Sequence, residues 1–204
     1  IQSEVLRFGE FELKSGRISP YFFNAGEFNN GAAMNAISRF FAESIIDSEI
    51  QFDVLFGPAY KGITLSCGTA MALAEKTNQN VPYAYNRKEK KDHGEGGTTV
   101  GSQLMGQIAI IDDVITAGTS IRESVELITA VGATPAAVFI ALDRQERSPN
   151  SELSAVEAVQ DSFNMPVVAI AGLNELLEYI KDRAEFQQYW DAISKYRDEY
   201  GVSG

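Results

Sequence analysis

Two adjacent carboxylates, Asp112 and Asp113, end a short apolar run and are followed at once by small and hydroxyl-bearing residues. Two neighbouring carboxylates at a strand end cannot both be buried without partners, and they suit a diol or a hydrated cation. Directly after them, Gly118 lets the backbone approach a ligand closely, and Thr119 and Ser120 add hydroxyl donors near a helix start. These features suit a phosphate. A diol site beside a phosphate site indicates a ribose 5-phosphate ligand.

Each half of this motif also has an ordinary structural interpretation. The acid pair can simply end a strand, and Thr119 or Ser120 can simply cap a helix. The two halves together favour the ligand site, because context gives a short motif its specificity. Other nucleotide-binding loops do not fit: residues 57–62 lack the Gly-Lys-Ser/Thr ending of a P-loop, and residues 94–97 lack a G-x-G-x-x-G register.

Helix and strand patterns alternate around this loop. Apolar residues at spacings of three and four predict helices, and short apolar runs bounded by Gly or Pro predict strands. The predicted strands cover residues 52–56, 82–86, 108–111, 136–142 and 166–170. The predicted helices cover residues 31–47, 63–76, 120–131, 154–163, 174–181 and 184–200. This order predicts an α/β fold with a mainly parallel sheet covered on both faces, whose ligands bind beyond the carboxyl ends of the strands.

Length and composition indicate one globular domain, residues 1–204. The chain has 45% hydrophobic and 22% charged residues, which excludes disorder and a disulfide scaffold. No uncharged run reaches the ~20 apolar residues of a membrane span. The net charge of -11 argues against a nucleic-acid partner. The lone Cys67 is interpreted as a small buried residue and is compatible with a reducing compartment.

One segment is locally basic, although the chain as a whole is acidic. Residues 86–101 are too polar and too rich in glycine for a core element. They contain a dense basic group: Arg87, Lys88, Lys90, Lys91 and His93. Such a run is usually a solvated surface, and the alternative is a cationic binding segment.

Six segments carry a resemblance to a known family. Residues 110–120 (IIDDVITAGTS) resemble the acid-pair loop of the phosphoribosyltransferases. Five others resemble, in order, the orotate phosphoribosyltransferase family: 8–17 (FGEFELKSGR), 19–26 (SPYFFNAG), 55–62 (LFGPAYKG), 86–97 (NRKEKKDHGEGG) and 142–146 (LDRQE). The resemblance covers nearly the whole chain. The five ordered segments are more specific than the acid-pair loop, which relatives acting on other bases share.

The resemblance implies a fold and a reaction. The fold is the type I phosphoribosyltransferase fold: a mainly parallel central sheet flanked by helices, a small hood from roughly residues 1–30 and 144–175, and a mobile loop at 86–101. The reaction transfers the 5-phosphoribosyl group of 5-phosphoribosyl-1-pyrophosphate (PRPP) to orotate, giving orotidine 5'-monophosphate and pyrophosphate in pyrimidine (UMP) biosynthesis. Also implied is a cytoplasmic homodimer whose loop 86–101 reaches the partner's site, with no nucleic acid and no membrane.

The resemblance also implies a cofactor and a set of site residues. Mg²⁺ is the cofactor, held mainly by PRPP and water rather than by direct protein ligands, with Asp112 and Asp113 nearby. The PRPP-binding set is Lys14, Tyr60, Lys61, Arg87, Lys88, Lys91, His93, Asp112, Asp113, Val114, Ile115, Thr116, Ala117, Gly118, Thr119 and Ser120. The orotate-binding set is Phe22, Phe23, Thr116 and Arg144, and the catalytic set is Lys14, Lys91, His93 and Asp113.

Elementary chemistry is consistent with these implied roles. Displacement at an anomeric carbon passes through a cation-like state, so the site needs groups that hold pyrophosphate rather than a covalent nucleophile. The planar fork of Arg144 matches a carboxylate or a ring carbonyl of orotate. His93 is a candidate proton donor to pyrophosphate, because the unperturbed pKa of histidine is ~6.5.

Two alternatives stay open at this level. One is a phosphoribosyltransferase for another nucleobase, against which residues 19–23 and 143–146 argue. The other is a PRPP-binding regulatory protein that catalyses nothing. The acidic charge of the chain and the intact basic segment argue against that second alternative.

Overall fold

The computed structural model describes residues 1, 3–13, 15–91, 97–148 and 151–202, and the side chains at 90, 91 and 97 are outside this description. Two antiparallel strands come first, β1 (Leu6–Glu12) and β2 (Ile18–Phe23). The main sheet has the order β5-β4-β3-β6-β7-β8 and is parallel except where β4 pairs with β5. Its strands are β3 (Val54–Gly57), β4 (Tyr83–Lys91), β5 (Gly97–Gly101), β6 (Gln107–Asp112), β7 (Thr134–Asp143) and β8 (Val167–Gly172).

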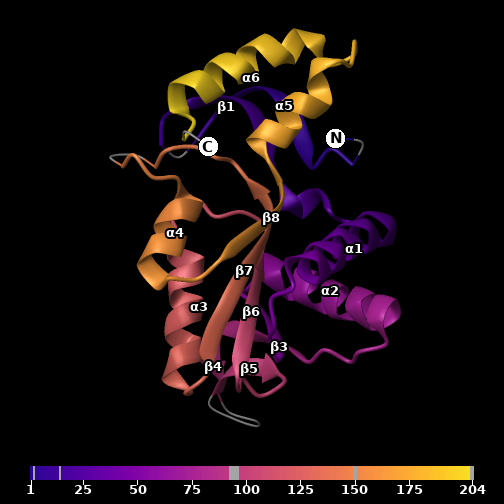
Figure 1. Cartoon of the computed structure of the whole chain (residues 1–204), viewed down its shortest axis with the longest axis vertical. Helices are drawn as coiled ribbons and strands as arrows, with labels where there is room; N and C mark the ends of the chain where they lie inside the picture. The colour runs from indigo at the N-terminus through magenta and orange to yellow at the C-terminus, as the bar shows by residue number, and fades with distance from the viewer. Residues whose placement is uncertain (2, 14, 92–96, 149–150, 203–204) are drawn as a thin grey trace.

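Helices cover both faces of this sheet. The helices in the described part of the chain are α1 (Gly31–Ser48), α2 (Lys61–Thr77), α3 (Thr119–Ala130), α4 (Ala155–Phe163), α5 (Leu173–Lys181) and α6 (Gln187–Tyr200), with a short 3-10 turn η1 (Ala25–Glu27). Figure 1 shows α1 and α2 on one side of the sheet and α3 and α4 on the other. Each helix predicted from apolar spacing is present, with its ends within a few residues of the prediction. Within the described residues, no helix is both long and apolar enough to cross a membrane.

Strand β6 shows why the sheet is buried on both faces. Its side chains at Ile108 and Ile110 pack in the cluster that α3 and α4 cover. The alternating side chains at Ala109 and Ile111 pack in the cluster that α1 and α2 cover. All four are fully buried, as expected for a strand with a continuous apolar run in a parallel sheet. The predicted α/β class is therefore confirmed.

A third hydrophobic cluster forms a separate layer, which we call the hood. It joins Tyr21 of β2 to residues of α5 and α6, including Leu177 and Tyr196. Figure 1 shows this layer at the top, beyond the ends of β7 and β8. Helix α4 falls inside the expected hood range 144–175 but packs on the main sheet, whereas α6 lies outside that range and packs on β2. The strands of the hood were not among the predicted strands.

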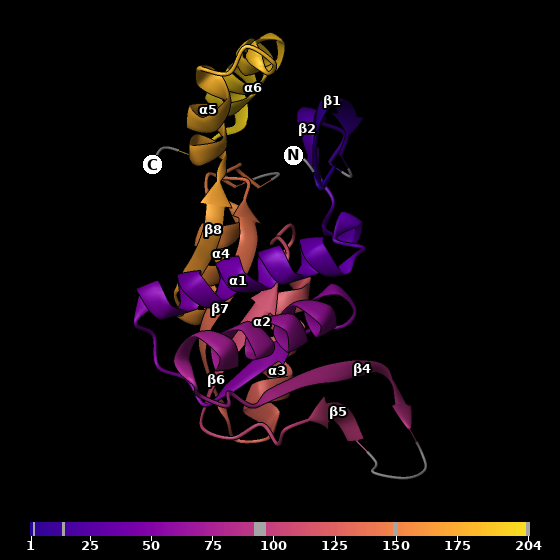
Figure 2. The same ribbon diagram turned by 90° about the vertical axis from the view of Figure 1, so that its right-hand side faces the viewer.

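The segment 86–101 contains more regular structure than its composition indicates. Strand β4 continues to Lys91, and β5 pairs with it antiparallel from Gly97 to Gly101. Backbone pairing alone can form such an edge hairpin, because its hydrogen bonds do not need apolar side chains. The strands at 87–91 and 97–101 were therefore missed, because the predicted strand ended at residue 86. Figure 2 shows the two strands projecting away from the body of the protein.

Candidate functional site

The acid pair lies where three parallel strands end side by side. Asp112 is the last residue of β6, which is flanked by β3 and β7. The backbone carbonyl of Asp113 accepts hydrogen bonds from the N–H groups of Ala141 and Leu142, at 2.9 and 3.2 Å. These bonds fix the turn after β6 against β7, so both carboxylates sit at the edge where ligands of parallel sheets bind.

Both carboxylates are buried and both have partners. In Asp112, Oδ1 accepts from the backbone N–H of Asp113, and Oδ2 accepts from Ser120 Oγ, each at 2.9 Å. Asp113 Oδ2 lies 2.7 Å from the ammonium nitrogen of Lys61, whose side chain is about half exposed. Buried carboxylates need polar partners, and here one hydroxyl, one backbone amide and one ammonium group supply them.

Asp112 holds its proton far more tightly than an ordinary aspartate. Burial, and then repulsion by Asp113, raise its pKa from 3.8 to about 7, although hydrogen bonds from the Asp113 backbone and from Ser120 oppose the change. In the folded state this carboxyl therefore keeps a proton that the unfolded chain has already released. Its contribution to the free energy of unfolding falls as the pH rises from 3.8 to about 7.

We expect Asp112→Asn to remove this pH dependence. Between pH 5 and pH 8 the free energy of unfolding of the wild type should fall by roughly 2–3 kcal/mol more than that of the variant, because each pKa unit is worth about 1.4 kcal/mol. Urea unfolding at the two pH values measures the effect. Asp161→Asn, a change on the exposed surface of α4, should keep the wild-type dependence. If Asp112→Asn differs from the wild type by the same free energy of unfolding at both pH values, ionisation of Asp112 is not the cause of the pH dependence.

The loop after the acid pair divides into a packed part and an exposed part. The side chain of Val114 packs against the hood cluster, and that of Ile115 packs in the core beneath α3. Their side chains are thus occupied, and only their backbone can meet a ligand. Thr116, Ala117 and Thr119 are exposed. The position of this loop was therefore predicted correctly, but its division into side chains that pack in the core and side chains that face solvent was not.

The start of helix α3 is open toward a ligand. Its N-cap residue is Gly118, with φ of 71° and no side-chain hydrogen bond to the first turn. The N–H groups of a first helical turn have no partner inside the helix, and they carry partial positive charge. A phosphate can satisfy them, with the exposed hydroxyl of Thr119 beside it.

The loop after β3 is held tightly by two glycines. A Cβ added to Gly57 would lie 2.0 Å from the carbonyl oxygen of Gly62, and one added to Gly62 would lie 2.9 Å from the carbonyl oxygen of Ile111. This close packing carries Lys61, the first residue of α2, to Asp113. The glycines are therefore required by packing between the loop and β6.

Strand β4 brings part of the basic run to this loop. Asn86 Oδ1 accepts a hydrogen bond from the backbone N–H of Ala59 at 2.7 Å. Lys88 Nζ lies 5.8 Å from the centre of the exposed Tyr60 ring. Two predicted PRPP-binding residues, Tyr60 and Lys88, are thus neighbours, with Arg87 beside them on β4.

Three predicted residues cannot be placed in this site. Lys14 and His93 lie outside the described residues, and the backbone of Lys91 ends β4 while its side chain is outside the description. Their roles remain predictions.

Two of the predicted base-side residues, Phe22 and Phe23, lie on β2, whereas Thr116 lies in the exposed loop before α3. Phe22 stacks on Phe11 with ring centres 5.4 Å apart, and Phe23 meets Phe28 edge-on at 6.4 Å. The two phenylalanines are half-buried and point to opposite faces of β2. The rings of Phe22 and Phe23 therefore do not form one continuous surface on which a base could stack. Phe23 and Val114 pack against the same hood cluster.

Arg144 already has protein partners. Its Nη2 donates to Glu146 Oε1 at 2.6 Å and to Ser19 Oγ at 3.2 Å, and its guanidinium lies 4.5 Å from the centre of the Tyr21 ring. Sequence reasoning gave Glu146, Tyr21 and Asn86 no role. The available signal for Glu146 was an acid two residues after an arginine at the end of an apolar strand.

Comparison with known proteins agrees with this geometry. Residues 24–170 match the family model described as a phosphoribosyl transferase domain. The chain is 57% identical over 202 residues to an orotate phosphoribosyltransferase of Pseudomonas aeruginosa, covering 99% of this chain and 94% of that protein. It is 59% identical over 202 residues to one of Chromobacterium violaceum, with the same coverage. A crystal structure of orotate phosphoribosyltransferase from Francisella tularensis superposes with a TM-score of 0.89 at 42% identity, covering 98% of this chain and 96% of that one.

The match to the family model covers more than half of the chain and defines its class, a phosphoribosyltransferase. Within that class, the chain belongs to the orotate phosphoribosyltransferase family.

Proposed function

We propose that the chain transfers the 5-phosphoribosyl group of PRPP to orotate, and that the acid pair and the loop 114–120 hold the sugar phosphate. The observation that carries the proposal is the buried pair Asp112 and Asp113, each with a polar partner, directly before the start of α3, which has no side-chain cap. Carboxylates accept hydrogen bonds from the 2' and 3' hydroxyls of a ribose, and the N–H groups of the first turn of α3 and the hydroxyls of residues 116–120 donate to its 5'-phosphate.

In this proposal Lys61 lies between the ribose site and the pyrophosphate site. Its ammonium is 2.7 Å from Asp113, and its neighbour Tyr60 is exposed beside Lys88. Pyrophosphate leaving the anomeric carbon gains negative charge, which these cations offset. The family resemblance supports three further roles: Lys91 for the departing pyrophosphate, Lys14 for a position between PRPP and the base, and His93 for protonation of the leaving group. No protein nucleophile is needed, because orotate itself attacks the carbon.

Mg²⁺ fits this arrangement as a companion of PRPP. Asp112 and Asp113 offer adjacent hard oxygen atoms of the kind that Mg²⁺ prefers. In the part of the chain that the structure describes, no three His, Cys, Asp or Glu side chains come together as a metal site. PRPP oxygens and water would supply the remaining ligands. When bound, the ion neutralises part of the pyrophosphate charge.

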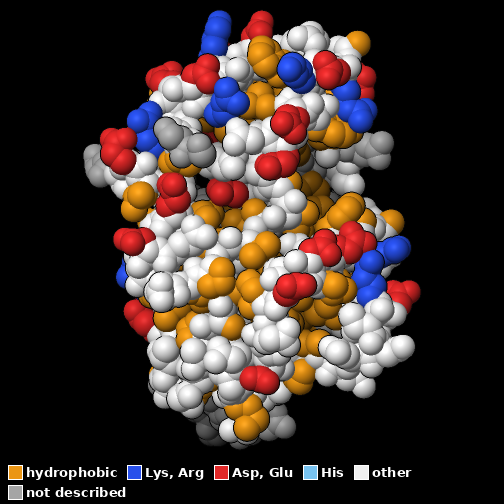
Figure 3. Space-filling view, in the orientation of Figure 1, with side chains coloured by type: hydrophobic (Ala, Val, Ile, Leu, Met, Phe, Trp, Pro, Cys, Tyr) orange, Lys and Arg blue, Asp and Glu red, His pale blue; other side chains and the backbone are white. Residues whose placement is uncertain are grey.

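The assembly of the enzyme is part of the same proposal. We propose a cytoplasmic homodimer in which the segment 86–101 contributes to the neighbouring site, a role supported by the projecting hairpin of β4 and β5 in Figure 2. No nucleic acid or membrane takes part. The net charge of -11 supports this, as does the mixing of acidic with basic side chains over the hood in Figure 3.

An absorbance assay of orotate consumption with PRPP and Mg²⁺ tests the proposed reaction. The expected result is loss of orotate in step with release of pyrophosphate, and no reaction with uracil, adenine or hypoxanthine. Turnover of one of those bases in place of orotate would indicate a phosphoribosyltransferase of other specificity. PRPP binding without turnover of any base would indicate a regulatory protein.

Arg144→Ala is expected to raise KM for orotate about tenfold and to leave KM for PRPP within about twofold. A hydrogen bond to a charged group contributes about 1.5–3 kcal/mol, so its loss should appear on the side of the base. Steady-state kinetics with each substrate varied in turn measures both constants. Arg183→Ala, on the exposed turn after α5, is the matched control and should change neither. Equal increases in the two constants would contradict a role in base recognition.

A further inference from the structure

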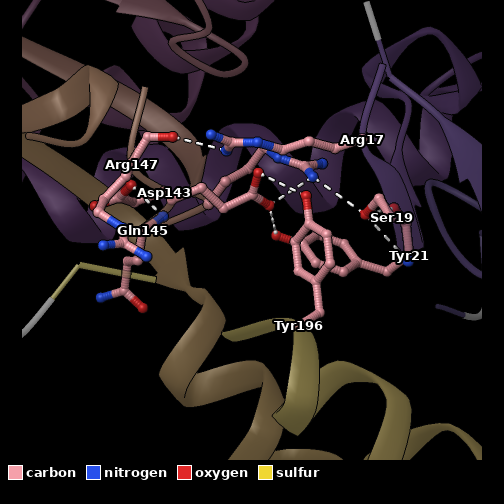
Figure 4. A network of polar contacts seen from close by, with 9 residues as sticks. Arg17, Ser19, Tyr21, Asp143, Gln145, Arg147 and Tyr196 are labelled. Carbon is pink, nitrogen blue, oxygen red and sulfur yellow. Dashed lines mark hydrogen bonds and ion pairs between the residues drawn. The ribbon is translucent and has the colours of Figure 1, made fainter. Parts of the chain in front are cut away.

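Three side chains from distant parts of the chain meet at the carboxylate of Glu146. Tyr21 of β2 donates its hydroxyl to Oε1 at 2.9 Å, and Tyr196 of α6 donates its hydroxyl to Oε2 at 3.0 Å. Arg144 donates to Oε1 at 2.6 Å. Figure 4 shows Tyr21 and Tyr196 close together although they come from two different elements, and their ring centres lie 6.3 Å apart. Both carboxylate oxygens are therefore engaged by protein donors.

This group is buried and carries balanced charge. The side chains of Arg144 and Glu146 are 15% and 9% exposed, and Tyr21 and Tyr196 are buried. Burial, and then the nearby Glu146, raise the pKa of Tyr196 to about 12, so its phenol stays protonated and donates at neutral pH. A buried carboxylate with three donors is held in one orientation, because rotation would leave at least one of them without a partner.

The consequence for Arg144 is a fixed guanidinium. Among the described residues, its hydrogen bonds all run through Nη2, to Glu146 and Ser19, and one face of its plane lies against the Tyr21 ring. The remaining N–H donors of the fork are available to a ligand. An arginine side chain has about 2 kcal/mol of rotamer entropy, so prior fixation lowers the cost of binding.

We infer that Glu146, anchored by Tyr21 and Tyr196, is the positioning residue that aims Arg144 at the base. The inference rests on the proposed base-side role of Arg144. It makes the C-terminal helix α6 part of the specificity of the site, because Tyr196 of α6 donates its hydroxyl to Glu146 at 3.0 Å. Because Glu146 offsets the charge of Arg144, the base is recognised by directed hydrogen bonds rather than by net positive charge.

Tyr196→Phe tests this chain of contacts without altering Arg144 or Glu146. It removes one hydroxyl and keeps the ring that packs in the hood. We expect KM for orotate to rise about three- to tenfold, the size expected for the loss of one ordinary hydrogen bond, while kcat and KM for PRPP stay within about twofold. Tyr200→Phe is the matched control: Tyr200 packs on Tyr196 in the same helix, with ring centres 4.9 Å apart, and its loss of a hydroxyl should change none of the constants.

A double-mutant cycle separates positioning from a merely structural role. If Tyr196 acts through Arg144, then Tyr196→Phe should add nothing to KM for orotate in the Arg144→Ala background. The same fold increase in both backgrounds would overturn the inference, as would an unchanged KM in Tyr196→Phe alone. If Tyr196→Phe does not fold, Glu146→Gln takes its place in the cycle, because it keeps the shape and one acceptor oxygen, with the same expected and contradicting results.

The cycle also distinguishes failure of the inference from failure of the proposed function. If Arg144→Ala raises KM for orotate and Tyr196→Phe does not, the base-side role stands and only the positioning role is wrong. If the wild type does not use orotate, the proposed function is wrong. If the wild type uses orotate and Arg144→Ala leaves its KM unchanged, Arg144 has no role in base recognition, and the positioning role is wrong with it.

Discussion

Asp113→Asn is expected to lower kcat/KM for PRPP by about 100-fold. The amide keeps the shape of the carboxylate but loses its negative charge. In the proposed site the carboxylate oxygens accept hydrogen bonds from the ribose hydroxyls, and their charge stabilises the positive charge that develops on the ring. Charged hydrogen bonds contribute about 1.5–3 kcal/mol each, and each 1.36 kcal/mol is a factor of ten in rate. The change also leaves the ammonium of Lys61 without its partner at 2.7 Å. Steady-state kinetics at saturating orotate measures the effect.

The control for Asp113→Asn is Asp191→Asn, an exposed aspartate of α6. It makes the same chemical change far from the carboxyl ends of the strands and should leave kcat/KM for PRPP unchanged. Thermal unfolding should show that both variants are folded. A folded Asp113→Asn enzyme with kcat/KM within threefold of the wild type would show that Asp113 does not hold the ribose.

Lys91→Ala is expected to lower kcat by about 100- to 1000-fold with little change in Tm. Lys91 ends β4, in the projecting hairpin, and alanine leaves the backbone pairing of a strand intact. In the proposed reaction its ammonium stabilises charge that appears on pyrophosphate only as the bond breaks. Removing one such donor from a transition state typically costs this much in rate. Rapid-quench or steady-state measurement of pyrophosphate release gives kcat.

Lys90→Ala is the matched control for Lys91→Ala, because it removes the same charge from the neighbouring residue of the same strand. Its kcat should stay within about threefold of the wild type. Equal losses in the two variants would indicate a general effect of local charge, and a normal kcat in Lys91→Ala at saturating orotate would contradict the assigned role.

The sequence allowed prediction of the features that depend on local pattern. The alternation of apolar strands with amphipathic helices predicted β3, β4, β6, β7 and β8 and the helices between them in their order along the chain, because burial on both faces demands apolar runs such as 108–111. The acid pair and the loop 114–120 were predicted as a site because their chemistry lies within a few consecutive residues. For the same reason their position at the end of β6 was predicted correctly.

Features that depend on distant contacts were not predictable in this way. The ion pair of Lys61 with Asp113 joins the start of α2 to the turn after β6, and the bond from Tyr196 to Glu146 joins α6 to the turn after β7. No local spacing encodes either contact. The extension of β4 was missed for a related reason: its polar side chains indicate solvent, whereas its strand structure comes from backbone pairing with β5.

A crystal structure of the complex with PRPP and Mg²⁺ tests the central claim most directly. The account predicts the 5'-phosphate at the first turn of α3 and residues 116–120, with the ribose 2' and 3' hydroxyls against Asp112 and Asp113 and the pyrophosphate beside Tyr60 and Lys61. Density for PRPP at another place, or Asp112 and Asp113 keeping their present protein partners while the sugar lies elsewhere, would contradict it.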